Sequence, residues 1–256
     1  MISIQSLTFE YSNHSPLFQN FNWNIERGET WAILGPSGCG KTTLLYLLAG
    51  LKFPTSGEVT IHGERIHRPR PRSGLILQDY GLLPWSTVRE NVALGLNVRK
   101  FYGADGKHTP DNFIPKDNID SWIQRLGLSE VADKFPSQLS GGQRQRTAIA
   151  RTLALEPDLL LMDEPFSSLD AITREDLQNL TLSLCEEQNI TLVMVTHAIE
   201  EAAVLGKKIL LLDAPPNQSP HIFENPDAGK AGYQNSSEFQ SLCKELRNEM
   251  QKRSAQ

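Results

Sequence analysis

A glycine-rich segment, residues 34–44, restricts the possible folds of this chain more than any other stretch. It carries the spacing G-x-x-x-x-G-K-T from Gly35 to Thr42, after an apolar run and before a helical apolar pattern. That order predicts a strand, a loop and a helix, which is the context that a phosphate-binding loop needs. Glycines let successive backbone N–H groups point at one spot, and the start of the helix adds its positive dipole end.

The side chains of this loop have the chemistry that a nucleotide requires. The Lys41 ammonium can reach the outer phosphates, and the Thr42 hydroxyl can ligate Mg²⁺. The alternative is a glycine-rich turn that carries a lysine by chance, but the flanking strand and helix patterns disfavour it. We therefore expect a nucleoside triphosphate site that includes Gly35, Pro36, Ser37, Gly38, Cys39, Gly40, Lys41, Thr42 and Thr43.

Composition limits the classes of protein that remain. The chain has 256 residues, of which 39% are apolar and 21% charged, as in an ordinary globular protein. The net charge of -5 argues against a nucleic-acid-binding protein. The three cysteines have neither disulfide nor metal-ligand spacing. No run approaches the ~18 apolar residues of a membrane helix, and the first residues do not form a signal peptide. Work at a membrane would then require a partner.

Two kinds of strand pattern predict the core. Residues 2–11, 18–26 and 57–63 alternate apolar and polar side chains, which is typical of half-buried strands in an antiparallel sheet. Four short runs are almost wholly apolar, as parallel strands covered on both faces must be: residues 74–77, 159–162, 191–195 and 209–212. We expect an α/β fold with a parallel-sheet core, an antiparallel β subdomain and an inserted helical subdomain.

Polar side chains follow three of the four apolar runs. Gln78 comes after the first run, Asp163 and Glu164 after the second, and His197 shortly after the third. In open α/β sheets the ligand lies outside the carboxyl ends of the strands. We therefore expect these four side chains to converge where the phosphate loop points.

Helical patterns fill the stretch between Gln78 and about residue 150. Residues 88–96 are amphipathic and residues 119–126 end before Gly127, whereas residues 100–116 are expected to form a loop. The basic residues 68–72 are expected to form a solvated surface link rather than a binding patch.

These patterns predict one domain with a tail. The domain would span residues 1–216, with an α/β core of residues 1–78 and 151–216 and a helical subdomain of residues 79–150. Residues 217–256 would form a partly helical tail, because residues 238–252 show weak helical periodicity.

A second helix start with anion-binding character lies at residues 138–143. Ser140 can cap the helix, and the bare N–H groups of Gly141 and Gly142, followed by Gln143, can approach a phosphate. Taken alone, Ser-Gly-Gly favours an ordinary capped helix, but Leu-Ser-Gly-Gly-Gln is rare by chance.

Together these segments resemble, in order and spacing, the motif set of ATP-binding cassette (ABC) ATPases. The resemblance spans residues 1–213 and implies a P-loop NTPase (RecA-like) core that hydrolyses ATP. Residues 78–92 and 163–174 are similar to the importer subgroup that serves nitrate, sulfonate, taurine and pyrimidine-precursor uptake. Trp31, residues 100–116 and Gln143 depart from that subgroup and leave the solute open. The resemblance rests on residues 35–42, 78, 139–143, 161–164, 168–170 and 197.

The resemblance implies binding roles for the site residues. Lys41 and the loop backbone would hold the β- and γ-phosphates of ATP. Thr42 and Gln78 would ligate Mg²⁺, with Asp163 acting on the metal directly or through water. Tyr11 would stack on adenine, although on sequence alone it is equally a plain strand end.

It also implies a catalytic set of Glu164, His197 and Gln78. Glu164 would polarise the attacking water, with a purely structural carboxylate as the alternative. His197 would bond the γ-phosphate and orient the water.

In the family, two cassettes pack head to tail. Residues 140–143 would then close the partner's site, and Asp170 would cross the same interface, so that ATP holds the two chains together. The second chain is expected to be an identical copy. The apolar run from Tyr80 to Trp85 is expected to dock a membrane permease subunit, with packing inside the helical subdomain as the alternative.

The leading expectation is the ATPase subunit of a solute importer, peripheral at the cytoplasmic face of the plasma (inner) membrane. Its partners would be transmembrane permease subunits and an external solute-binding protein, with no nucleic acid. The alternative is a soluble ABC-type ATPase, which the single cassette and the absence of a basic bias disfavour. A P-loop phosphotransferase would have no use for residues 139–143, and an exporter half would carry membrane helices in the same chain.

Overall fold

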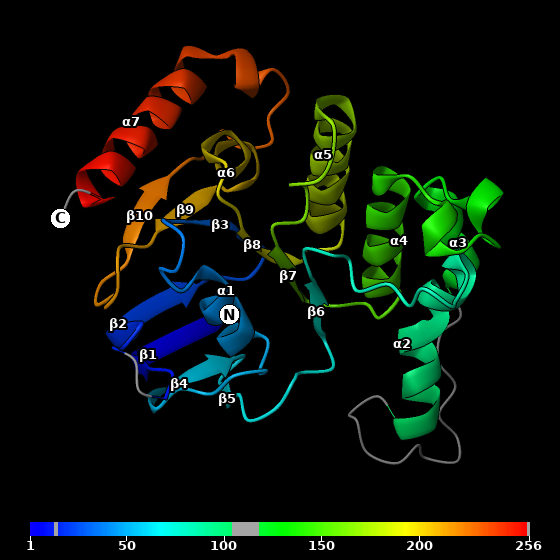
Figure 1. Cartoon of the computed structure of the whole chain (residues 1–256), viewed down its shortest axis with the longest axis horizontal. Coiled ribbons are helices and arrows are strands. Elements are labelled where there is room, and N and C mark those ends of the chain that lie inside the picture. The colour runs from blue at the N-terminus through cyan, green and yellow to red at the C-terminus, as the bar shows by residue number, and fades with distance from the viewer. Residues whose placement is uncertain (13–14, 104–117, 255–256) are drawn as a thin grey trace.

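The computed structural model describes residues 1–12, 15–103 and 118–254, and it contains two sheets with helices around them (Figure 1). The larger sheet has the strand order β10-β9-β3-β8-β7-β6. β3 (Thr30–Leu34) pairs in parallel with β8 and β9, and β7 pairs in parallel with β8 and β6. The four apolar runs form β6 (Ser73–Ile76), β7 (Leu159–Asp163), β8 (Thr191–Val195) and β9 (Lys208–Leu211), as expected.

The smaller sheet is antiparallel, as the alternating patterns predict, with the order β2-β1-β4-β5. Its strands are β1 (Ile2–Phe9), β2 (Phe18–Ile25), β4 (Ser56–Ile61) and β5 (Glu64–Arg65). Helix α1 (Lys41–Leu48) follows the phosphate loop, and its leucines are buried in the cluster that also contains the smaller sheet. Gly50 takes φ 71° just after the helix, which is the conformation that ends it.

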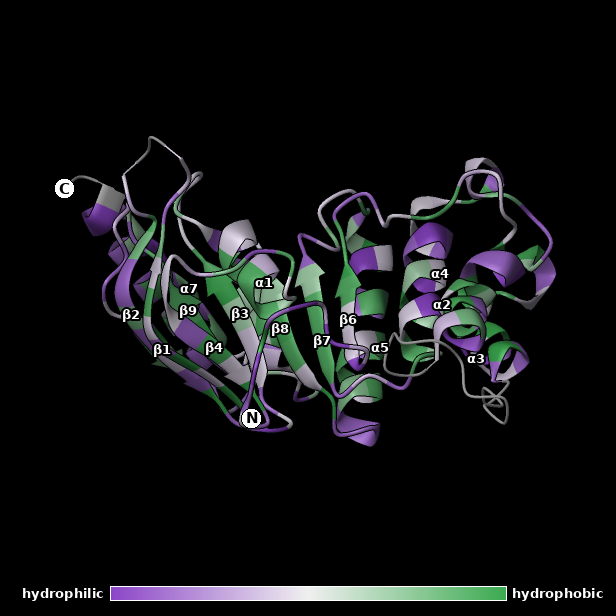
Figure 2. Ribbon diagram, turned by 90° about the horizontal axis from the view of Figure 1, so that it is seen from below, coloured by the Kyte–Doolittle hydropathy of each residue, from purple (hydrophilic) through white to green (hydrophobic). Residues whose placement is uncertain are grey.

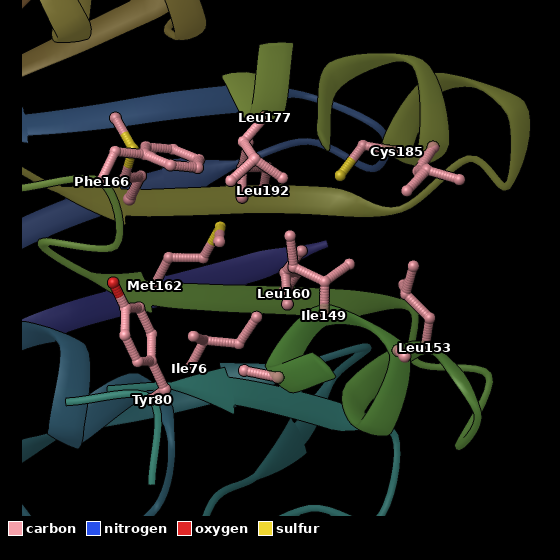
Figure 3. Close-up of a cluster of buried hydrophobic side chains, with 14 of the residues drawn as sticks. Ile76, Tyr80, Ile149, Leu153, Leu160, Met162, Phe166, Leu177, Cys185 and Leu192 are labelled. Atoms are coloured by element: carbon pink, nitrogen blue, oxygen red, sulfur yellow. The ribbon is translucent and has the colours of Figure 1, made fainter. Parts of the chain in front are cut away.

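The parallel strands of the larger sheet, β3 and β6 to β9, consist largely of apolar residues (Figure 2), and their side chains contribute to two buried clusters. Side chains alternate along each strand, so one strand serves two clusters. On β7, Leu159 and Leu161 face α1 and the smaller sheet, whereas Leu160 and Met162 face the helices on the other side. Figure 3 shows this second cluster, in which Ile149 and other helical side chains surround the strand residues. Each fully buried leucine of this kind contributes roughly 1.5–3 kcal/mol of hydrophobic stabilisation.

The helices between β6 and β7 lie together at one end of the molecule (Figure 1). They are α2 (Val88–Tyr102), α3 (Ile119–Arg125) and α4 (Gly141–Leu153), with short 3-10 turns at Ser129–Val131 and Pro136–Gln138. α4 packs against α2 and α3 and also against β6. The expected subdomain boundary at residue 150 therefore falls inside a helix that joins both parts, and it stays a proposal.

Helix α2 is longer than the sequence pattern predicted. Residues 100–102, expected to be in a loop, continue the helix to Tyr102. The Arg99 guanidinium donates a hydrogen bond to the Leu155 carbonyl oxygen at 2.9 Å, which anchors the last turns to the end of α4. Two basic residues in this last turn also suit the negative end of the helix dipole. The remainder of the expected loop, residues 104–117, lies outside the described residues.

The basic link, residues 68–72, is not simply solvated as expected. The Arg70 guanidinium forms a two-pronged ion pair with Asp158, with one contact at 2.6 Å, and Arg72 lies 3.6 Å from the same carboxylate. Burial raises the pKa of the Asp158 carboxyl, but the hydrogen bonds and charge of Arg70 outweigh it, so the net pKa is lowered. The link is thus clamped to the start of β7.

The remaining helices and the tail complete the fold. α5 (Ala171–Glu187) and α6 (Ile199–Leu205) follow β7 and β8. The expected tail helix forms α7 (Ser237–Ser254), after a 3-10 turn at Tyr233–Asn235. β10 (His221–Glu224) was not expected, because its mostly exposed residues carry no apolar alternation. It pairs antiparallel with β9, so residues beyond 216 belong to the core sheet.

Within the described ranges, we find no helix that combines the length and the apolar character needed to cross a membrane.

Candidate functional site

The loop between β3 and α1 requires glycine at two positions. Gly35 takes φ 154° and Gly40 takes φ 107°. A Cβ atom on Gly35 would lie 2.8 Å from the Leu212 carbonyl oxygen, and one on Gly40 would lie 3.0 Å from the Phe18 ring. No L side chain fits these positions without moving its neighbours. The loop therefore packs closely between β2 and the end of β9, directly before the N-terminus of α1.

Lys41 folds back over the loop. Its Nζ atom donates hydrogen bonds to the carbonyl oxygens of Gly35 at 2.8 Å and Pro36 at 2.9 Å. A cavity of about 970 Å³ opens beside it, which is large enough for a nucleotide. The cavity combines the ammonium and the loop backbone with a carboxylate and an aromatic ring, and its lining includes Tyr11, Ser37, Lys41, Thr43, Glu164 and Pro215.

A second cavity of about 820 Å³ adjoins the first, because Thr42 lines both. Gln78 and Asp163 line this second cavity, at the ends of β6 and β7, as the strand-end pattern predicts. The Thr42 hydroxyl donates a hydrogen bond to Asp163 Oδ1 at 3.2 Å. Hydroxyl, amide and carboxylate oxygens are the donors that Mg²⁺ prefers.

The electrostatics of Asp163 fit a cation. Burial raises the pKa of the Asp163 carboxyl, and the neighbouring charge of Glu164 raises it further, against the lowering effect of the Thr42 hydrogen bond. A cation beside the carboxylate would reverse this shift. Among the described residues, no cluster of three or more His, Cys, Asp or Glu side chains forms a metal site. Mg²⁺ usually takes one or two carboxylates together with substrate phosphates and water.

Glu164 and His197 lie in contact. Glu164 Oε2 is 3.1 Å from His197 Nδ1, and the Glu164 carboxylate lines the larger cavity while Asp163 lines the smaller one. Glu164 takes φ 46°, which is uncommon for a residue with a side chain. Its N–H group donates to the Val195 carbonyl oxygen at 2.9 Å, so the ends of β7 and β8 are tied together at this residue. Backbone strain of this kind is typical of functional positions.

Sequence reasoning missed the residues that hold the His197 loop. The Thr196 hydroxyl donates to the buried Glu201 carboxylate and accepts a hydrogen bond from the Ala198 N–H at 3.1 Å. The Gln178 amide of α5 donates to the same carboxylate at 3.4 Å. His197 is thus framed by a buried polar network. Burial raises the pKa of the Glu201 carboxyl. Glu201 follows Thr196 by five residues and lies on the short helix α6, and this spacing could have indicated that the two side chains interact.

The segment at residues 140–143 forms a capped helix start, and the residue that follows it, Arg144, lines the smaller cavity. The Ser140 hydroxyl accepts from the Gln143 N–H, and the Gln143 side chain accepts from the Ser140 N–H, which is a capping box for α4. A Cβ atom on Gly141 would lie 3.1 Å from Leu169, so the start of α4 packs closely on the loop before α5. Asp170 caps α5 by accepting from the Thr173 N–H at 3.1 Å. Ser140 and Asp170 are both exposed.

Tyr11 lies at the rim of the larger cavity, with 39% of its surface exposed. Its hydroxyl hydrogen-bonds with Thr43 Oγ1 at 3.0 Å, its ring packs edge-on against Phe9 with centroids 5.1 Å apart, and Lys52 Nζ lies 4.8 Å from the ring centroid. The ring is thus fixed beside the loop, which meets one requirement for a stacking residue.

The run from Tyr80 to Trp85 begins with residues that pack inward and ends with an exposed residue. Tyr80 is buried and its hydroxyl hydrogen-bonds with Ser168 Oγ at 2.7 Å, while Leu82 packs against the core. Trp85 is 72% exposed. Tyr80 and Leu82 therefore pack inward, whereas Trp85 presents an exposed apolar side chain.

Comparison with known proteins decides the family. The model of the ABC transporter family matches residues 18–167, which is more than half of the chain. The chain belongs to the ABC transporter family. It is 37% identical over 251 residues to the aliphatic sulfonates import ATP-binding protein SsuB of Bacillus cereus, covering 96% of this chain and 94% of that protein. It is 41% identical over 216 residues to the taurine import ATP-binding protein TauB of Roseobacter denitrificans, covering 83% and 77%.

Solved structures agree with this assignment. The ATP-binding cassette MJ0796, in a dimeric post-hydrolysis state bound to ADP and Pi, superposes with a TM-score of 0.72 at 30% identity, covering 88% of this chain and 98% of that one. The expected P-loop NTPase fold and the expected class of enzyme, an ABC-type ATP hydrolase, are confirmed.

Proposed function

We propose that this ABC ATPase is the energy-supplying subunit of a solute importer, and that its ATP hydrolysis drives transport through a partner membrane permease. The supporting observation is the convergence of Lys41, Thr42, Asp163 and Glu164 at one edge of the sheet, in a chain that is similar to sulfonate and taurine import ATP-binding proteins. Family and site together favour transport over a soluble ATPase.

Binding of ATP would use both cavities. The triphosphate would lie against Lys41 and the loop N–H groups, and the adenine would lie toward Tyr11. Thr42, Gln78 and Asp163 would hold Mg²⁺, and the Thr42–Asp163 hydrogen bond already brings two of the oxygen donors together. When bound, the metal offsets the negative charge of the phosphates.

Glu164 would act on the attacking water. In the proposed reaction its carboxylate orients and polarises a water molecule and accepts a proton from it. The water oxygen bonds to the γ-phosphorus while the bond to the β-phosphate oxygen breaks, which leaves ADP and phosphate. His197 contacts Glu164 at 3.1 Å and would donate a hydrogen bond to the γ-phosphate. Gln78 would complete the catalytic set from the smaller cavity.

A second copy of the chain would complete each site. Ser140 and Asp170 are exposed caps at the starts of α4 and α5, and their loops are in contact through Gly141 and Leu169. Two exposed helix starts side by side are suited to one interface. Arg144 lines the smaller cavity, whereas residues 140–143 are not in the described lining of either cavity, and in our proposal they serve the site of the partner chain. The proposed assembly is a head-to-tail homodimer that closes over two ATP molecules.

The permease would dock at Trp85, next to the Gln78 segment that lines the smaller cavity. A side chain of this size with 72% exposure suits an apolar partner surface. The protein would then be peripheral at the cytoplasmic face of the plasma membrane, with an external solute-binding protein delivering the solute.

Affinity purification from native membranes tests the proposal. We expect permease subunits to co-purify with the wild-type chain, and Trp85→Ala to reduce that recovery without lowering the basal ATPase rate. The matched control is Ile222→Ala, because Ile222 is also an exposed apolar residue but lies on β10. Recovery of soluble proteins alone would favour the soluble ATPase instead.

A further inference from the structure

Asn217 is a buried asparagine in the segment that follows β9, with 3% of its surface exposed. Its backbone N–H donates to the Leu17 carbonyl oxygen at 2.9 Å, and its own carbonyl oxygen accepts from the Gln19 N–H at 2.9 Å. Its side-chain Oδ1 accepts from the Asp213 N–H at 2.8 Å. Asn217 therefore joins the segment after β9 to the start of β2.

The side-chain amide of Asn217 reaches the phosphate loop. Its Nδ2 atom donates to the Cys39 carbonyl oxygen at 2.9 Å and to the Leu17 carbonyl oxygen at 3.2 Å. Cys39 is itself fully buried, so this bond is shielded from water. The Cys39 carbonyl is one half of the peptide that joins Cys39 to Gly40, and Gly40 lines the larger cavity.

The geometry of that peptide gives the bond a consequence for the ligand. A trans peptide is planar, so its C=O and N–H groups point in opposite directions. Because Asn217 holds the Cys39 carbonyl toward the tail, the Gly40 N–H is turned away from the tail. Backbone N–H groups of such a loop are the ones that bind phosphate. Gly40, at φ 107°, has the freedom to take other orientations if the carbonyl is released.

The C-terminal helix holds this arrangement from its other end. The Arg253 guanidinium, on the last turn of α7, forms an ion pair with the Asp213 carboxylate and also lies 2.6 Å from His221 Nε2. The Asp213 N–H is the donor to Asn217 Oδ1. One continuous chain of contacts thus runs from α7 through Asp213 and Asn217 to Cys39.

We propose that Asn217 is a positioning residue of the nucleotide site, which orients the Cys39–Gly40 peptide for phosphate binding, and that α7 supports it through Arg253 and Asp213. The C-terminal tail then has a defined task, which is to set the affinity of the phosphate loop. The proposal rests on nucleotide binding at this loop and is independent of transport and of pairing between two chains.

Two readouts on the full-length chain test the proposal. The first is the dissociation constant of a fluorescent ATP analogue. The second is the rate at which N-ethylmaleimide modifies Cys39, followed residue by residue by mass spectrometry. Burial raises the pKa of the Cys39 thiol, so its modification should be slow in the wild type. Cys185 and Cys243, also buried but distant from the loop in sequence, report whether the whole fold loosens.

We expect Asn217→Ala to weaken nucleotide binding about tenfold and to accelerate Cys39 modification about tenfold. Of the three hydrogen bonds that the side chain makes, the one to the Cys39 carbonyl acts on the loop, and its loss corresponds to about 1.4 kcal/mol. Cys185 and Cys243 should be unaffected. Gln218→Ala is the matched control, since this exposed neighbour bonds only the Gln19 side chain, at 3.0 Å, among its described contacts. Arg253→Gln should change both readouts in the same direction by a smaller factor.

An unchanged rate of Cys39 modification in Asn217→Ala would overturn the proposal, as would an equal acceleration at all three cysteines. If Asn217→Ala does not fold, Arg253→Gln decides, and a wild-type Cys39 rate in that variant counts against the role of α7. A wild-type chain that binds no nucleotide would refute the proposed function instead, and the modification rate would still test the Asn217 bond.

Discussion

Replacing Thr196 with valine removes the hydroxyl that frames the His197 loop and keeps the shape of the side chain. Thr196 is 1% exposed, and its hydroxyl donates to Glu201 and accepts from the Ala198 N–H. A neutral hydrogen bond is worth about 1 kcal/mol and one to a carboxylate about 1.5–3 kcal/mol. The loss should therefore be roughly 2.5–4 kcal/mol of unfolding free energy. At about 2–4 °C per kcal/mol, the Tm should fall by roughly 5–15 °C.

The same change should slow hydrolysis without weakening nucleotide binding. Thr196 does not appear in the described lining of either cavity, so the dissociation constant of ATP should stay near that of the wild type. The kcat should fall at least about tenfold, which corresponds to about 1.4 kcal/mol of lost positioning at His197. Thr196→Ser keeps the hydroxyl and is the matched control. The reasoning would be refuted by a valine variant whose kcat and Tm equal those of the serine variant in a steady-state ATPase assay and a thermal melt.

Three further changes probe other parts of the site. Lys41→Ala should weaken ATP binding by about two orders of magnitude, because a charged donor to the phosphates is lost; wild-type affinity by titration calorimetry would contradict the phosphate-loop assignment. Ser140→Arg should block turnover while one chain still binds ATP, and loss of binding in the monomer would show that residues 140–143 serve their own site. Burial raises the pKa of the Glu201 carboxyl above the value of an unfolded glutamate, which is about 4.3. As pH rises past that value, the folded chain keeps a proton on Glu201 that the unfolded chain has lost. This residue therefore lowers the free energy of unfolding as pH rises toward neutrality. Glutamine does not titrate, so the unfolding free energy of Glu201→Gln, measured by urea titration, should fall less between pH 4.5 and 7 than that of the wild type. Plots of unfolding free energy against pH that run parallel for the two proteins would exclude the effect.

Local patterns in the sequence predicted much of the fold. The phosphate loop and the four apolar strands are visible because each is a short segment whose spacing or composition is dictated by backbone geometry. The strand-end rule then placed Gln78, Asp163 and Glu164 at the cavities, because parallel strands in one sheet end at the same edge.

The parts that sequence reasoning missed depend on contacts between distant segments. β10 is a mostly exposed edge strand, so it carries no apolar alternation to detect. The bond from Asn217 to Cys39 joins residues 178 positions apart, and nothing in either local sequence indicates it. Arg70 belongs to a segment whose prolines and charges suggest a solvated link, but Asp158 gives it a partner 88 positions away.

The most direct test of the two-chain site is the oligomeric state of Glu164→Gln in the presence of ATP. This variant should bind ATP, hydrolyse it very slowly, and accumulate as a dimer by size-exclusion chromatography with light scattering, while the same variant without nucleotide should stay monomeric. A monomer at saturating ATP, or wild-type turnover by Glu164→Gln, would contradict the account.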